Sequence, residues 1–67
     1  MTYKDKIIKA LSLCETLDDV DYIEQKIERT SQINRRTEVG RVLTRELLNL
    51  ANQKARQLIR EGAVPFN

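Results

Sequence analysis

Residues 37–61 read TEVGRVLTRELLNLANQKARQLIRE, and this stretch decides the fold. It contains no proline and one glycine, and its apolar residues return at the spacing of an α-helix. Five of them fall within about a third of the helix circumference, namely Val39, Leu43, Leu47, Leu50 and Leu58. Four more widen this apolar arc to about half the circumference, namely Leu48, Ala51, Ala55 and Ile59. A one-sided surface helix has a stripe of about 100°, so this helix is expected to contact two neighbours.

The composition favours a folded, amphipathic helical protein, because 33% of the 67 residues are charged and 40% are hydrophobic. One cysteine and no histidine exclude an internal disulfide and a zinc finger. No apolar run approaches the ~18 residues of a membrane span. We therefore expect a cytoplasmic protein with no membrane contact, consisting of one helical domain (residues 1–62) and a short tail (63–67).

Two short helices are predicted before the long one. Thr2 and Asp5 resemble a capping box, and a helix over residues 3–14 would place Ile7, Leu11 and Cys14 on one face. Thr16 is a clear cap for a second helix over residues 17–30, whose first turn is acidic. The connection between them is so short that they should form an antiparallel hairpin.

The third helix is predicted over residues 35–61, which makes the fold all-α with three helices. Ser31, Asn34, or Thr37 followed by Glu38 are alternative starts for it. Gly62 suits the position just after its end.

No catalytic constellation is visible in the chain. Cys14 falls on an apolar face and has no histidine to activate it, so it reads as a core residue. Asp18, Asp19 and Asp21 lie close together, but capping of a helix accounts for them. We therefore expect no enzyme activity, metal, cofactor or small-molecule substrate.

Charge is distributed unevenly along the chain. Residues 1–33 carry five basic and seven acidic side chains, and residues 34–67 carry seven basic and three acidic ones. Within the third helix, six polar side chains share a stripe about 100° wide, namely Arg41, Arg45, Asn49, Asn52, Arg56 and Arg60. This basic stripe suits an acidic partner, or DNA if the second and third helices form a helix-turn-helix. A joint without glycine, a very long third helix and a stripe without aromatic residues count against DNA.

The difference in helix length predicts a homodimer. The first two helices would be about 21 Å long and the third about 37 Å. A short second connection would hold the hairpin against the first half of the third helix. The second half would then need a partner for five apolar residues, and a second copy is the simplest one. This predicts a dimer interface of Leu48, Ala51, Ala55, Leu58 and Ile59.

Two segments, residues 7–11 (IIKAL) and 16–20 (TLDDV), followed by a basic helix, resemble small helical modules encoded by bacteriophages. These include the C-terminal segments of some phage recombination proteins and short early-region accessory proteins of lambda-like phages. The resemblance covers residues 7–30 and implies a small protein of the bacterial cytoplasm that binds something larger. It assigns no role to any individual residue. The sequence thus predicts a non-enzymatic accessory or regulatory protein that binds a host or phage protein, with a DNA-binding regulator as the alternative.

Overall fold

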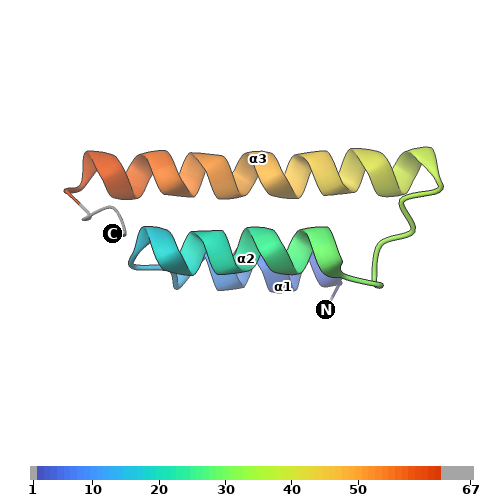
Figure 1. Ribbon diagram of the computed structural model, residues 1–67, viewed down its shortest axis with the longest axis horizontal. Helices are drawn as coiled ribbons and strands as arrows, with labels where there is room; N and C mark the ends of the chain where they lie inside the picture. Colours follow the sequence, from blue (N-terminus) through green and yellow to red (C-terminus); the bar gives the residue numbers. More distant parts are fainter. Residues whose placement is uncertain (1, 63–67) are drawn as a thin grey trace.

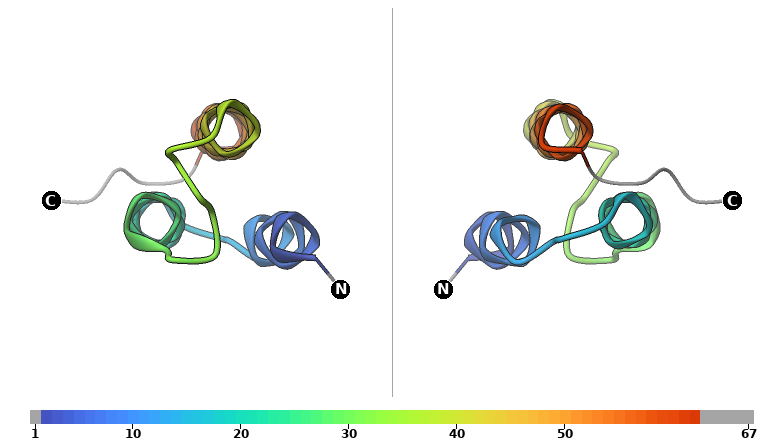
Figure 2. Two further views of the ribbon diagram at one scale, coloured as in Figure 1. Left: turned by 90° about the vertical axis from the view of Figure 1, so that its right-hand side faces the viewer. Right: turned by 90° about the vertical axis from the view of Figure 1, so that its left-hand side faces the viewer.

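The computed structural model describes residues 2–62, which fold into three helices with no strand. Helix α1 spans Tyr3–Ser12, α2 spans Leu17–Arg29 and α3 spans Glu38–Arg60. α1 and α2 form an antiparallel hairpin along one side of α3 (Figure 1). Seen end-on, the three helices occupy the corners of a triangle (Figure 2). The all-α class and the three helices are confirmed; the predicted tail, residues 63–67, lies outside the described residues.

Each helix begins at a threonine that caps it. The Thr2 hydroxyl accepts a hydrogen bond from the backbone N–H of Asp5 at 3.2 Å, and the Asp5 carboxylate accepts one from the Thr2 N–H at 3.4 Å. Thr16 and Asp19 form the same capping box. Thr37 caps α3, because its hydroxyl accepts from the N–H of Gly40 at 3.0 Å. Of the three predicted starts for α3, the one at Thr37 and Glu38 is therefore correct.

The helices end close to where the sequence predicts. α1 ends two residues before the predicted position, because the N–H groups of Leu13 and Cys14 turn back to the carbonyls of Ala10 and Leu11. α2 ends at Arg29. Gly62 follows α3 with φ of +89°, a conformation that glycine adopts without strain. The prediction that Gly62 marks the end of the third helix is confirmed.

The core lies between the three helices and takes apolar residues from each of them. Its buried members are Ile7, Leu11, Cys14, Val20, Ile23, Ile27, Ile33, Leu47, Ala51 and Leu58. The predicted apolar face of the first helix, with Ile7, Leu11 and Cys14, is thus confirmed. Two core residues come from connections and not from a helix: Cys14 lies between α1 and α2, and Ile33 lies between α2 and α3.

That connection, residues 30–37, is packed rather than being a simple polar joint. Ile33 is buried in the core, and the Arg35 guanidinium donates a hydrogen bond to the carbonyl of Ile27 near the end of α2. The Asn34 carbonyl accepts hydrogen bonds from the N–H and the hydroxyl of Thr37, at 3.2 and 2.8 Å. The same carbonyl lies so close to Gly40 that a β-carbon there would overlap with it. The segment therefore fixes where α3 begins.

As a result, the hairpin lies against the middle and the C-terminal part of α3, and the N-terminal turns of α3 extend past it (Figure 1). Lys4, in the first turn of α1, pairs with Glu46 at 3.3 Å, well past the start of α3. Our prediction that the second half of α3 has no partner within the chain is wrong: Ala51 is 0% exposed and Leu58 is 5% exposed. The reason is the connection of residues 30–37, which carries the chain beyond the end of α2 before α3 starts.

Candidate functional site

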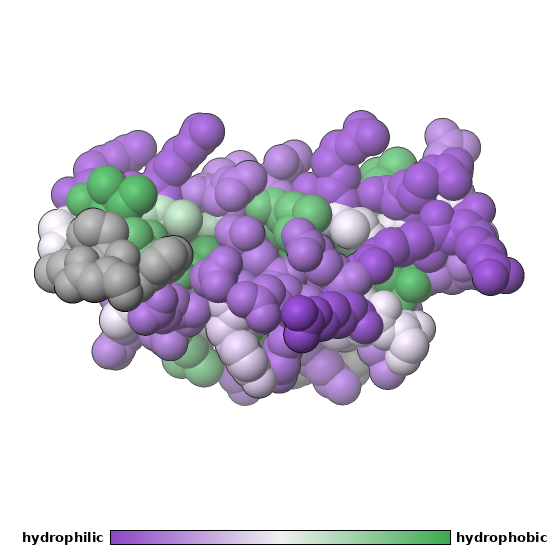
Figure 3. Space-filling model, in the orientation of Figure 1, coloured by the Kyte–Doolittle hydropathy of each residue, from purple (hydrophilic) through white to green (hydrophobic). Residues whose placement is uncertain are grey.

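The basic stripe of α3 lies on the outside of the molecule. All six of its side chains are exposed: Arg41, Arg45, Asn49, Asn52, Arg56 and Arg60. At 3.6 residues per turn they point away from the face of α3 that carries Leu47, Ala51 and Leu58. Figure 3 shows long hydrophilic side chains projecting along the edge of the molecule that α3 forms. The structure therefore keeps together all the residues that the sequence assigned to this face.

The arginines of the stripe have no carboxylate partner among residues 2–62. Within residues 2–62, the one ion pair joins Lys4 to Glu46, and neither residue belongs to the stripe. α3 carries five basic residues and two acidic ones, Glu38 and Glu46. The stripe therefore presents an unneutralised positive charge along most of the length of the helix, which attracts acidic surfaces over several ångströms.

A second surface, which the sequence did not single out, lies at the N-terminal end of α3. We call it the overhang groove: Val39, Val42 and Leu43, with Glu38 and Glu46 at its rim. Val39 is 78% exposed and Val42 is 45% exposed, whereas Leu43 packs partly against the core. The sequence placed Val39 on the buried face, which is wrong, because the hairpin does not reach that far along α3. Helical spacing alone could not predict this surface, because its exposure depends on where the hairpin lies along α3.

The five residues predicted as a dimer interface have different surroundings in the structure. Ala51 and Leu58 are buried in the core of the single chain, and Leu48 and Ala55 are partly buried against that core. Ile59 is 60% exposed. The set is thus mainly part of the core, although dimerisation itself remains a prediction.

Cys14 is buried, as the sequence predicted. Its thiol donates a hydrogen bond to the carbonyl of Ala10 at 3.3 Å. Desolvation by burial raises the pKa of the Cys14 thiol, the nearby charge of Asp19 raises it further, and Lys54 lowers it. A raised pKa keeps the thiol protonated and poorly nucleophilic.

The acidic residues at the start of α2 serve its cap. Hydrogen bonds from the backbone N–H groups of Glu15 and Thr16, then from the Thr16 hydroxyl, lower the pKa of Asp19. Within residues 2–62, no group of three or more carboxylate or thiol side chains is arranged to hold a metal ion. Asp19 forms the cap of α2 and Asp18 lies beside it in the first turn, whereas the Asp21 carboxylate accepts a hydrogen bond from the Gln25 side chain at 3.0 Å.

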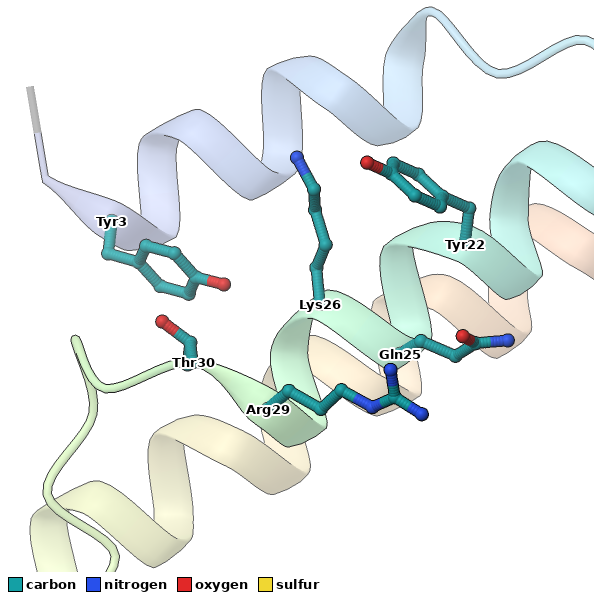
Figure 4. A pocket seen from close by; sticks show the side chains of 6 residues that line it. All are labelled: Tyr3, Tyr22, Gln25, Lys26, Arg29 and Thr30. Carbon is teal, nitrogen blue, oxygen red and sulfur yellow. The ribbon is translucent and has the colours of Figure 1, made fainter.

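A shallow hollow between α1 and α2 holds the two tyrosines of the chain (Figure 4). Lys26 and Tyr22 reach from α2 toward α1, and the Lys26 ammonium lies 5.0 Å from the centre of the Tyr22 ring. An exposed cation–π contact of this kind contributes roughly 0.5–1 kcal/mol. Tyr3 points toward Thr30 from the first turn of α1. The hollow is explained by packing between the two helices, and its aromatic rings lie away from the basic stripe.

Comparison with protein families, with characterised proteins and with solved structures finds no match to this chain. Among the described residues, none of the helices has the length and apolar character needed to cross a bilayer.

Proposed function

We propose that this protein is a small non-enzymatic accessory protein that acts by binding a larger protein through the basic stripe of α3. The observation that supports this most is the exposure of all six stripe residues on one face, without carboxylate partners in residues 2–62. The partner surface would be acidic. In keeping with the resemblance of residues 7–30, we place this partner in the bacterial cytoplasm and the gene in a bacteriophage.

The physical basis is electrostatic complementarity on a rigid support. α3 has 23 residues, so it holds its charges at fixed spacing over about 35 Å. Complementary charge accelerates association and selects against basic partners more than it adds affinity. Arginine also forms two parallel hydrogen bonds with a carboxylate, which fixes the orientation of the bound surface.

Duplex DNA is the second candidate partner, because arginine and asparagine side chains also hydrogen-bond to base edges. The packed connection of residues 30–37 holds α2 and α3 in an antiparallel arrangement along their length (Figure 1). A recognition helix needs its N-terminal turns free for the major groove, and the overhang of α3 satisfies that condition. We favour the protein partner, because α2 and α3 lie antiparallel (Figure 1), whereas the two helices of a helix-turn-helix cross at about 90–120°. The stripe also continues along the whole of α3.

The test is capture from a bacterial lysate on immobilised protein, followed by mass spectrometry. The stripe variant Arg41→Ala/Arg45→Ala/Arg56→Ala is compared with a control, Lys6→Ala/Lys9→Ala/Arg29→Ala, which removes the same charge from exposed positions on α1 and α2. We expect one protein to be retained by the wild type and the control and lost from the stripe variant. Equal retention by all three proteins would contradict the proposal.

A parallel binding assay with duplex DNA separates the two candidates. If DNA is the partner, affinity should fall steeply with salt, since each neutralised phosphate releases counterions. The stripe variant should then flatten that dependence. We expect no detectable binding at about 50 mM salt, and tight binding that depends on the stripe would favour the DNA candidate.

A further inference from the structure

The overhang groove exposes apolar side chains that the described part of the chain leaves uncovered. Val39 and Val42 lie three residues apart and form a short apolar seam along the outside of α3. In a coiled coil, two apolar positions in every two turns form the seam that packs against a partner helix, and Val39 and Val42 supply one such pair. The surface is separate from the basic stripe in its chemistry, since it is apolar with two glutamates at its rim.

We propose that a second copy of this chain covers the overhang groove, with the two α3 helices packed antiparallel about a two-fold axis. At 100° per residue, Glu38 and Arg45 lie on the same flank of the Val39–Val42 seam, seven residues apart. A two-fold axis between antiparallel helices brings each flank against the same flank of the second copy, running in the opposite direction. Glu38 therefore meets Arg45 of the second copy, and Arg45 meets its Glu38.

The shape of the molecule supports the same arrangement. The hairpin covers the middle and the C-terminal part of α3, so antiparallel packing at the N-terminal ends places the two hairpins at opposite ends of the dimer. A parallel pair would bring both hairpins to the same end. It would also set the flank with Glu38 and Arg45 against the flank with Leu43, where no opposite charge is available.

The contact would be small, and dimerisation would bring the two basic stripes to the same side of the assembly. It involves about three turns of helix from each copy, less than the ~800 Å² per partner that is usual for stable complexes. We therefore expect a weak dimer, with a dissociation constant between about 1 µM and 1 mM. The two-fold axis leaves both basic stripes on one side of the dimer and both hairpins on the other. Arg45 belongs to both the basic stripe and this contact, but the inference is tested on the purified protein alone and does not depend on what the stripes bind.

The test uses charge reversal and sedimentation equilibrium. Wild-type protein should show an average mass that rises from 7.8 kDa toward twice that value as concentration increases. Glu38→Arg places two arginines opposite each other at both pairs, and Arg45→Glu places two glutamates there. Each single variant should dimerise about tenfold more weakly or worse than the wild type. An equimolar mixture of the two variants should associate again, because each then meets its opposite charge.

The control is Lys6→Glu, which makes the same change of charge as Arg45→Glu at an exposed position on α1. It should dimerise like the wild type. Recovery of association in the mixture also shows that both single variants are folded. A wild-type protein that is monomeric at about 1 mM, single variants that dimerise normally, or a mixture that stays monomeric would each overturn the inference.

Discussion

Gly40 shows how one residue can set the geometry of a whole joint. It is buried in the first turn of α3, where its N–H is hydrogen-bonded to Thr37 and its α-carbon lies against the backbone carbonyl of Asn34. Neither atom of that contact belongs to a flexible side chain, so the connection cannot yield locally to a larger residue. The position of α3 relative to the hairpin depends on this close approach.

Replacing Gly40 with alanine should therefore destabilise the protein, although alanine is the better helix former by about 1 kcal/mol. We expect a net loss of about 1–3 kcal/mol in the free energy of unfolding, because the added methyl displaces the Asn34 carbonyl. Urea denaturation measures this loss in the free energy of unfolding. Gln53→Ala, at an exposed position in the same helix, serves as the control and should be neutral or slightly stabilising. A Gly40→Ala protein as stable as the wild type would show that the joint can adjust.

Glu24 offers a test through pH. Burial raises the pKa of its carboxyl, and the neighbouring charges of Asp21 and Glu28 raise it further. A carboxyl whose pKa is higher in the folded state destabilises the protein once the pH exceeds the unfolded-state pKa. Glu24→Gln should thus raise the unfolding temperature at pH 7. That gain should shrink to nothing as the pH falls below the ordinary pKa of a glutamate.

The matching control is Glu15→Gln, which removes one negative charge from an exposed position before α2. It should leave the pH dependence of unfolding nearly as in the wild type. If Glu24→Gln gave no gain at pH 7, or a gain that persisted at low pH, the raised pKa of Glu24, from burial and from the charges of Asp21 and Glu28, would not be the cause.

At the scale of the helices, the two neighbours Leu58 and Ile59 distinguish the core from the surface of α3. Leu58 is buried in the single chain and Ile59 is exposed. Leu58→Asp should unfold the protein, because a buried unpaired carboxylate costs several kcal/mol and a small domain has little stability to lose. Ile59→Asp should change the free energy of unfolding by no more than about 0.5 kcal/mol.

Circular dichroism and thermal unfolding of both variants measure this difference. A loss of stability from Ile59→Asp as large as that from Leu58→Asp would mean that Ile59 is buried in a contact between chains. The interface that the length of the helices suggested in the sequence would then be correct after all.

Local signals in the sequence were enough to find the helices. The threonine caps at Thr2 and Thr16 with their aspartates act within one turn, and the basic stripe depends only on helical spacing. The register of α3 against the hairpin is different, because it depends on contacts between distant residues. The burial of Ile33 and the hydrogen bond from Arg35 to Ile27 join the connection to α2, and no local pattern predicts them. This is why the exposed apolar surface was expected at the wrong end of α3.

At the scale of the whole molecule, the three helices have unequal lengths of 10, 13 and 23 residues. A hairpin this short cannot cover a helix this long, so one part of α3 must extend beyond it. The structure places that part at the N-terminal end, where Val39 and Val42 are exposed and the basic stripe begins. We infer that the protein acts through this exposed length of α3.

The most direct test is a concentration series of amide NMR spectra of the isotope-labelled wild-type protein, from about 10 µM to about 1 mM. Dimerisation through the overhang groove predicts that chemical shifts change with concentration and that the changes cluster in residues 36–46. Signals from residues 48–59, which include the interface expected from the sequence, should stay constant. Changes centred on residues 48–59, or spectra that do not change at all, would contradict dimerisation through the overhang groove.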